Sequence, residues 1–263
     1  MLDEPYRWVE AIRNRREYLQ DQLAAASPLV ACRYADGLLL LTSTPGPRKI
    51  FEAYNQIVFA GVGHPADIEK LRKSVIDIAH LEAFNLSAGD VSLQRLVNFG
   101  VGPLMKTAFD EIFRSPFIAR ILVAELDPSD ERETFCTVDA DGTFAGAAEA
   151  AVIAGVPHVA ESILAQLPTG SAPAPLNQAL ATVLRAWGIG RLANEVAAED
   201  SADSTVDPTP GPSDDQIATE IDAALETVRL EAAVLDRTLP TKSKFRLLDA
   251  ESLQAAVDVV KAP

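Results

Sequence analysis

The stretch that decides the fold is residues 29–43, which run Leu29-Val30-Ala31-Cys32-Arg33-Tyr34-Ala35-Asp36-Gly37-Leu38-Leu39-Leu40-Leu41-Thr42-Ser43. Asp36-Gly37 is a pair typical of tight hairpin turns, and apolar residues fill both flanks. The pattern therefore predicts a strand over residues 29–35, a turn at Asp36-Gly37 and a return strand over residues 38–43.

A helix is predicted ahead of this hairpin, over residues 5–26. Pro5 suits a first turn, and Ser27-Pro28 ends the pattern. Its apolar residues recur at helical spacing, and they are Trp8, Ile12, Leu19 and Leu23. Such a stripe has to be buried, and two partners remain open: a neighbouring subunit, or the core of the same chain.

Strands and helices then alternate in blocks. Further strands are predicted over residues 49–54, 57–62, 118–126, 134–138, 143–150 and 230–235, with a basic, edge-like segment over 242–248. Helices are predicted over 65–84, from Asp90 as N-cap to about 113, and over 157–167, 175–187, 214–224 and 249–260. Gly100, Gly102 and Pro103 predict a kink in the second of these helices. The order indicates a layered α+β or αββα arrangement in which helices pack outside sheets.

Residues 197–215 have a different composition from the rest of the chain. Asp, Ser, Pro, Thr and Gly dominate there, and large apolar side chains are almost missing. Such a segment cannot bury enough surface to order itself, which predicts a flexible acidic linker. We therefore expect a main domain over residues 27–196 and a C-terminal strand and helix within 216–263 that complete or decorate it.

Overall charge and cysteine content exclude several classes of function. The chain has 263 residues and a formal net charge of -15, which disfavours binding to nucleic acids or anionic membranes. Cys32 and Cys136 fit buried free thiols of a reducing compartment better than a disulfide or a metal pair. The start of the sequence does not resemble a signal peptide, and its apolar runs are too short to span a bilayer. We expect a cytoplasmic protein.

Common catalytic and cofactor motifs are missing from the sequence. It contains no Gly-rich phosphate loop, no Cys/His metal spacing and no nucleophile elbow. His64, His80 and His158 lie far apart and are expected to be structural. Asp139 and Asp141 suit a hairpin turn better than a cation site. No cofactor and no metal are expected.

Several segments resemble the proteasome superfamily, specifically the α-type subunits of actinobacteria. The resemblance is distributed, and its order and spacing carry it. It includes residues 29–37, Lys49-Ile50-Phe51-Glu52-Ala53-Tyr54-Asn55-Gln56-Ile57, Phe59-Ala60-Gly61-Val62-Gly63, Gly89-Asp90-Val91-Ser92, Val123-Ala124-Glu125-Leu126, and Leu230-Glu231-Ala232-Ala233-Val234-Leu235-Asp236-Arg237-Thr238-Leu239-Pro240 followed by Phe245-Arg246. It covers about residues 5–165 and 228–255.

The resemblance implies the four-layer αββα sandwich of Ntn hydrolases with a leading N-terminal helix. It further implies a non-catalytic α-ring subunit of the bacterial core proteasome, which forms the outer heptameric ring with other α subunits. Its expected partners are catalytic β-type subunits, a ring-shaped ATPase activator and unfolded, tagged protein substrates. Residues 1–26 would form a gate segment and a ring-contact helix. The gate would be Met1, Leu2, Asp3, Glu4, Pro5 and Tyr6, and the ring contact would use Trp8, Ile12, Leu19 and Leu23.

Catalysis in this superfamily needs a Thr, Ser or Cys exposed at the start of the first strand, with its own free amine as base. Ser27 is the one nucleophile at that place, but Ala26 precedes it and Pro28 follows it. The family's Asp position falls on or near Ser43, and the Lys position is kept as Lys49. The resemblance implies that Lys49 docks the C-terminal carboxylate of an activator, although it also fits an ordinary strand-edge lysine. An autoprocessed peptidase that uses Ser27 is the alternative.

Overall fold

The computed structural model describes residues 4–111, 113–126, 135–168, 170, 172–199 and 212–261, without the side chains of residues 4–6 and 195–199. Its strands are β1 (Leu29–Tyr34), β2 (Gly37–Thr44), β3 (Ile50–Tyr54), β4 (Ile57–Gly63), β5 (Ala119–Glu125), β6 (Phe135–Val138), β7 (Phe144–Ala147), β8 (Ala150–Ile153), β9 (Arg229–Asp236) and β10 (Phe245–Leu247). Its helices are α1 (Glu4–Leu23), α2 (Pro65–Asn85), α3 (Leu93–Arg95), the π-helix η1 (Leu96–Val101), α4 (Gly102–Asp110), α5 (Pro157–Leu164), α6 (Leu176–Glu199), α7 (Asp214–Leu225) and α8 (Ala250–Lys261).

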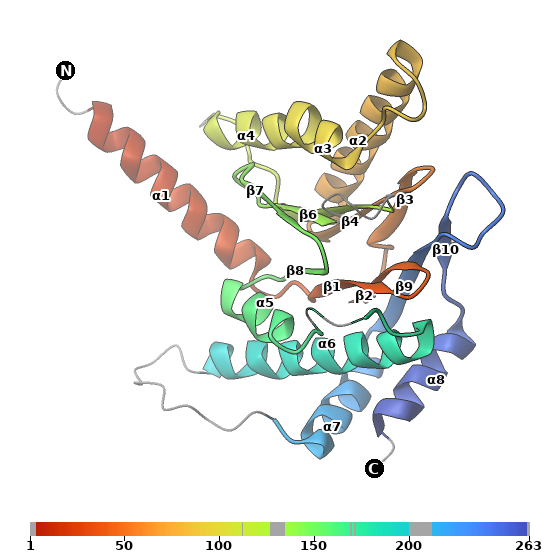
Figure 1. Cartoon of the computed structure of the whole chain (residues 1–263). Coiled ribbons are helices and arrows are strands. Elements are labelled where there is room, and N and C mark those ends of the chain that lie inside the picture. Colours follow the sequence, from red (N-terminus) through yellow and green to blue (C-terminus); the bar gives the residue numbers. More distant parts are fainter. Residues whose placement is uncertain are drawn as a thin grey trace.

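Two antiparallel sheets form the centre of the fold. Sheet 1 has the order β10-β9-β2-β1-β8, and sheet 2 has the order β3-β4-β5-β6-β7. In Figure 1, α2 to α4 cover the outer side of sheet 2, and α5 to α8 cover the outer side of sheet 1. The predicted αββα sandwich with a leading helix is confirmed. Sheets whose two faces are both covered explain why β2 and β4 are apolar along most of their length.

Three apolar clusters fill the three spaces between the four layers. One lies between the sheets and includes Leu40, Val58 and Leu122. A second joins sheet 2 to α2 and the α3–η1–α4 segment, and a third joins sheet 1 to the helices that follow it. No helix in the described part of the chain is long and apolar enough to cross a membrane.

The opening hairpin forms as predicted, but its turn lies one residue earlier. Tyr34 pairs with Gly37, so the two turn residues are Ala35 and Asp36, and Gly37 is already the first residue of β2. A side chain at Gly37 is excluded because a Cβ there would lie 1.9 Å from the carbonyl oxygen of Leu235 on β9. Gly37 therefore allows β2 and β9 to lie close together, and it is not one of the two turn residues.

The strand predicted over residues 143–150 ends early: β7 stops at Ala147, and a separate strand, β8, begins at Ala150 in the other sheet. β7 pairs with β6 in sheet 2, whereas β8 pairs with β1 in sheet 1. The chain passes from one sheet to the other at Ala148 and Glu149, which are exposed. The Glu149 backbone oxygen already accepts the Arg33 N–H of β1 at 3.0 Å, so the change of sheet is complete within these two residues. The run of small apolar residues around Glu149 concealed the break.

Two helix boundaries also differ from the predictions. Ser92, not Asp90, caps the helix that begins at Leu93, by accepting a hydrogen bond from the Arg95 backbone N–H at 3.5 Å. Asp90 instead accepts a bond from the Ser87 hydroxyl at 2.6 Å. The predicted kink takes the form of the π-helix η1, which ends where α4 begins.

The C-terminal part of the chain contributes to the interior of sheet 1. β9 lies between β2 and β10, and Leu38 to Leu41 of β2 pair with it directly. α6 continues past the predicted end at residue 187, as far as Glu199. Residues 200–211 of the predicted linker lie outside the described residues. Ser213 then starts α7 with a capping box that includes Gln216.

Candidate functional site

The leading helix α1 is fixed to the edge of the sandwich by its C-terminal half. Leu19 and Leu23 are buried in a small cluster with Phe109 of α4 and Ala140. Ile12 packs against this cluster, while Trp8 is 48% exposed. The apolar stripe therefore divides: its later residues pack on the chain's own core, and its earlier part faces solvent.

Charged residues of α1 strengthen this attachment. Arg15 donates to the carbonyl oxygens of Ala108, at 3.0 Å, and of Glu111, at 3.2 Å, where α4 ends. A guanidinium at the last carbonyls of a helix satisfies acceptors that have no partner within the helix. Arg16 donates to Asp141 in the β6–β7 turn at 3.3 Å. Of the predicted gate residues, Met1, Leu2 and Asp3 lie outside the described residues, and Glu4, Pro5 and Tyr6 belong to the first turns of α1.

Three residues singled out from the sequence meet where α1 leads into β1. The hydroxyl oxygens of Ser27 and Ser43 lie 2.6 Å apart, and the Lys49 ammonium donates to the Ser43 backbone oxygen at 2.8 Å. Ser43 is fully buried and Ser27 is half-buried. The three residues that the resemblance placed at, or near, the nucleophile, carboxylate and lysine positions are thus adjacent. The residue beside Ser27 is a serine and not a carboxylate.

A fourth residue, Glu231 on β9, completes this arrangement and was missed as a site residue. Its carboxylate accepts the backbone N–H groups of Lys49, at 2.9 Å, and of Ile50, at 3.0 Å. It is 8% exposed. Burial raises the pKa of the Glu231 carboxyl, and the two backbone N–H groups partly offset that rise. The acidic residue in an otherwise apolar strand was the available signal, since a buried carboxylate needs partners.

Burial also lowers the pKa of the Lys49 ammonium, and the Glu231 carboxylate partly compensates. Lys49 lines a cavity of about 560 Å³ that opens beside the β2–β3 connection. Ser27, Arg48 and Arg191 line it too, with Glu69 as an acidic member. The cavity can therefore accept an anionic group, because cations outnumber carboxylates among the described residues of its walls.

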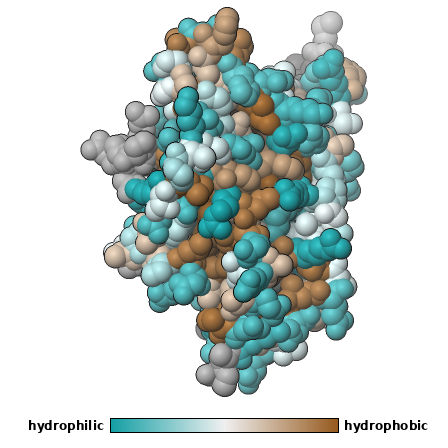
Figure 2. Space-filling view, turned by 90° about the vertical axis from the view of Figure 1, so that its right-hand side faces the viewer, coloured by the Kyte–Doolittle hydropathy of each residue, from teal (hydrophilic) through white to brown (hydrophobic). Residues whose placement is uncertain are grey.

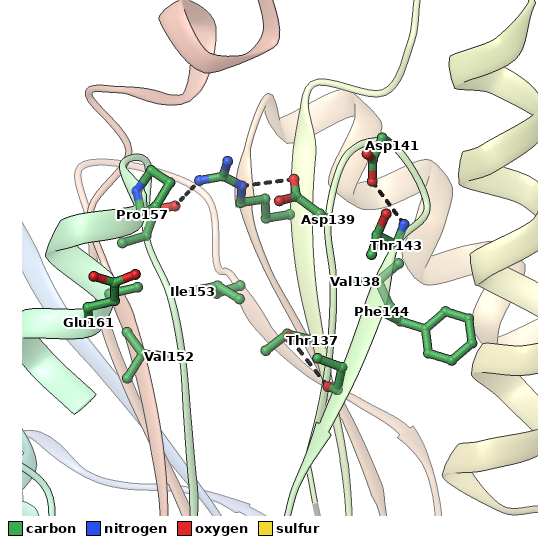
Figure 3. A pocket seen from close by; sticks show the side chains of 14 residues that line it. Thr137, Val138, Asp139, Asp141, Thr143, Phe144, Val152, Ile153, Pro157 and Glu161 are labelled. Carbon is green, nitrogen blue, oxygen red and sulfur yellow. Dashed lines mark hydrogen bonds and ion pairs between the residues drawn. The ribbon is translucent and has the colours of Figure 1, made fainter. Parts of the chain in front are cut away.

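A second cavity, of about 660 Å³, opens between the β6–β7 hairpin and β8 with α5. Figure 3 shows Thr137, Asp139 and Asp141 on one wall and Val152, Pro157 and Glu161 on the other. Arg120 of β5 lies at its base, 8% exposed, and donates to Asp139 at 3.0 Å and to the backbone oxygens of Ala154 and Gly155. Sequence reasoning did not single out this buried arginine, although a charged residue at the start of the apolar run of β5 was the same kind of signal as Glu231.

The remaining sequence candidates have structural surroundings. Asp141 accepts the Thr143 backbone N–H at 2.9 Å, which agrees with a turn at this position. His64 caps α2, and His80 packs edge-on against Tyr54. Cys32 and Cys136 are buried free thiols. Within the described ranges, no group of three His, Cys, Asp or Glu residues is placed to hold a metal ion.

The known proteins reported as similar to this chain are all proteasome α subunits. It is 27% identical over 248 residues to a proteasome subunit alpha of Actinosynnema mirum, a match that covers 94% of this chain and 84% of the relative. It is 26% identical over 255 residues to a proteasome subunit alpha of Streptomyces griseus, a match that covers 96% and 83%. The chain is a homologue of actinobacterial proteasome α subunits. No family model matches the sequence.

The similarity to these α subunits extends across both sheets and all four layers, since it spans nearly the whole chain. A shorter match of 28% identity over 138 residues, to a proteasome subunit alpha of Frankia alni, covers 52% of this chain. The resemblance in residues 5–165 and 228–255 is thus confirmed and extended.

Proposed function

We propose that this chain is a non-catalytic α-ring subunit of a bacterial core proteasome. It forms the outer heptameric ring with copies of itself and stacks on a ring of catalytic β-type subunits. The homology to proteasome α subunits supports the class. One structural observation supports the non-catalytic role: α1 leads into Ser27 and is packed onto the same fold.

The chemistry of the superfamily explains why that observation matters. The catalytic amine must be the free end of the chain at the nucleophile, since it acts as the base. Here the residues before Ser27 form a structured connection, in which the Ala26 N–H bonds the Leu23 carbonyl oxygen at 2.8 Å. Ser43 supplies a hydroxyl where a carboxylate would stabilise the charge of Lys49. In the intact chain, Ser27 therefore has neither a free amine as base nor that carboxylate beside it.

Residues 1–6 are proposed to gate the entry pore of this ring. The attachment of α1 through Leu23, Arg15 and Arg16 fixes the base of the segment relative to the sandwich. Segments held at equivalent points of a closed ring are related by its rotation axis, so seven copies directed inward would meet at the pore. Substrates in this proposal are unfolded, tagged proteins that a ring-shaped ATPase delivers.

Lys49 is proposed to receive the C-terminal carboxylate of that ATPase. Its ammonium is partly desolvated and has a neutral carbonyl, that of Ser43, as hydrogen-bond acceptor. An incoming carboxylate would replace this weak partner with a charge-assisted one. The cavity of about 560 Å³ provides space for the last residues of a peptide, and Arg48 adds a second cation. Capture of a C-terminus in a groove is a recurrent mode of peptide recognition.

Co-expression with an actinobacterial β-type subunit tests the assignment. We expect negative-stain images of stacked seven-fold rings and an intact mass for this chain that still includes α1. A chain that stays monomeric beside a folded β-type partner would contradict the ring role.

The second candidate function is an autoprocessed peptidase with Ser27 as nucleophile. The proximity of Ser27, Ser43 and Lys49 favours it, since these positions form the catalytic group in active relatives of the superfamily. It requires cleavage of the Ala26–Ser27 bond. A mature chain whose mass begins at Ser27 would support the peptidase and overturn the non-catalytic role.

A further inference from the structure

Strand β7 is an unprotected edge of sheet 2. It has the sequence Phe144-Ala145-Gly146-Ala147 and pairs with β6 on one side, with no second partner among the described strands. Phe144, Ala145 and Gly146 are exposed, and the strand contains no charge and no proline. Natural sheets usually protect such edges with charges, prolines or bulges, because free N–H and C=O groups otherwise recruit another chain. An apolar edge of this kind indicates a surface that another polypeptide covers.

Acidic residues surround β7, and two of them carry the local negative charge. Asp139, Asp141 and Glu161 line the cavity of about 660 Å³ next to it, and the exposed Glu149 follows the strand after one residue. Asp141 already pairs with Arg16, so Glu149 and Glu161 are the carboxylates that a partner would meet. Figure 3 shows Glu161 across the cavity from Asp139. Arg120 is the one cation among the described residues that line this cavity, and Asp139 pairs with it. A partner that covers β7 is therefore expected to carry cations.

The opposite side of the sandwich has the complementary properties. β7 and β8 end the two sheets on one side, and β3 and β10 end them on the other. Figure 2 looks onto the second side, where apolar side chains gather in the middle with hydrophilic ones around them. This distribution is typical of protein interfaces. On this side, residues 237–246 form the β9–β10 loop and the start of β10, and they hold Arg237, Lys242, Lys244 and Arg246 and no acidic residue, in a chain of net charge -15. Arg246 pairs with Asp236 of β9, so the loop itself supplies the cations available to a partner.

We propose that the β7 side of one copy receives the β9–β10 hairpin and the β3/β10 side of the next copy. This inference rests on the proposed ring function and identifies the surfaces that would make the ring. The cations of residues 237–246 face the carboxylates around β7, while the apolar edge strand meets the apolar middle of the opposite side. Two different faces of one subunit meet, which is the head-to-tail contact that closes a ring.

Charge also argues against the simplest alternative, a two-fold pairing of one β7 with another. That arrangement brings Glu149 and Glu161 of both copies into the same region, where like charges repel. The head-to-tail contact instead pairs opposite charges at its rim and leaves the apolar parts in its centre.

The test uses the full chain assembled with its β-type partner and a short bismaleimide cross-linker. Ala145→Cys places a thiol on β7, and Lys242→Cys places one on the β9–β10 hairpin; both positions are exposed. The native Cys32 and Cys136 are buried and stay unreactive. We expect the double variant to give a ladder of covalent oligomers on a denaturing gel, and each single variant to give none.

Controls separate failure of this contact from failure of the ring. A second double variant, Ala145→Cys with Ala223→Cys on the exposed side of α7, should give no ladder. Seven-fold rings without a ladder from the 145/242 pair would overturn the contact and leave the ring function intact. A covalent dimer from Ala145→Cys alone would overturn the contact in favour of two-fold pairing. A chain that forms no ring would overturn both proposals.

Charge reversal provides a second measurement on the same complex. Lys242→Glu should lower the yield of assembled rings, and the added change Glu161→Lys should restore part of it, because opposite charges then face each other again. Loss of assembly in Lys242→Glu without any rescue by Glu161→Lys or Glu149→Lys would count against the proposed facing surfaces. Circular dichroism of each variant checks that the fold is retained.

Discussion

The side chains of Ser27 and Ser43 share a hydrogen bond of 2.6 Å at the point where α1 passes into β1. Under the proposed function, the resemblance compares Ser27 with the nucleophile position and Ser43 with a position at or near the carboxylate that supports the lysine. Here both are hydroxyls, and the lysine at the third position, Lys49, donates to a backbone oxygen. The three side chains are thus close together, and none of the three is a carboxylate.

Ser27→Ala is the direct test of that interpretation. If Ser27 is structural, the assembled complex keeps its peptide hydrolysis and the intact mass changes only by the lost oxygen. The fold loses one partly buried hydrogen bond, which costs about 1 kcal/mol of unfolding free energy. Ser43→Ala should show the same stability loss, and a double variant should cost little more than either single one. A large fall in hydrolysis in Ser27→Ala alone would instead identify the serine as a nucleophile.

Lys49→Ala should uncouple the activator from the core particle. We expect ATP-dependent degradation of a protein substrate to fall by about tenfold or more, since an ion pair with a desolvated carboxylate is lost. Hydrolysis of a small peptide should change little. Lys261→Ala on α8, where the lysine pairs with Asp222, is the matched control and should leave both activities in place. Equal losses for both variants would argue against a specific docking role.

The same lysine predicts a pH dependence. Because burial lowers the pKa of Lys49, its ammonium loses its proton at a lower pH than an exposed lysine does. The charge that attracts a carboxylate is present below this lowered pKa and disappears as the pH rises through it. Binding of an activator C-terminal peptide, measured by fluorescence anisotropy, should therefore weaken on the alkaline side. Lys49→Arg should bind without this loss, because a guanidinium stays charged.

Glu231→Gln should lower the free energy of unfolding by about 1–3 kcal/mol because it disturbs the hydrogen bonds of this carboxylate. Chemical denaturation measures the change. The carboxylate accepts two backbone N–H groups, and an amide offers one oxygen for them, so one buried donor loses its partner. Since the pKa of Glu231 is raised in the folded protein, the native state binds the carboxyl proton of Glu231 more tightly than the unfolded chain does. The parent protein should therefore lose stability as the pH rises from the usual carboxyl range through the raised pKa. Glu231→Gln should lack this part of the pH dependence.

The two ends of the α1 stripe should respond differently to truncation. Leu23→Ala removes a fully buried side chain and should cost about 2–5 kcal/mol of unfolding free energy. Trp8→Ala changes an exposed residue and should leave the stability of the isolated chain nearly constant. If Trp8 contributes to the ring contact, its loss appears in native mass spectrometry as fewer rings. Rings in normal yield from Trp8→Ala would remove this residue from the proposed contact.

Local sequence determined the elements of this protein. Apolar residues at helical spacing located α1, α2 and α8, and the predicted start of the last helix at Asp249 is close to the observed one, where Asp249 accepts the Ser252 backbone N–H at 2.8 Å. The apolar runs on either side of Ala35 and Asp36 located β1 and β2. These predictions succeed because helix periodicity, caps and hairpin turns are set by residues within a few positions of each other. The family resemblance supplied the layer order.

Tertiary structure alone decided which strands pair and which side chains meet. The step of β8 into sheet 1 depends on its pairing with β1, which lies far earlier in the chain. Glu231 reaches the backbone of Lys49 only because β9 lies beside β2. Tertiary packing likewise decides which groups Arg120 contacts and which residues of the apolar α1 stripe are buried or exposed. Contacts of this kind depend on how the whole chain packs, and no local pattern contains them.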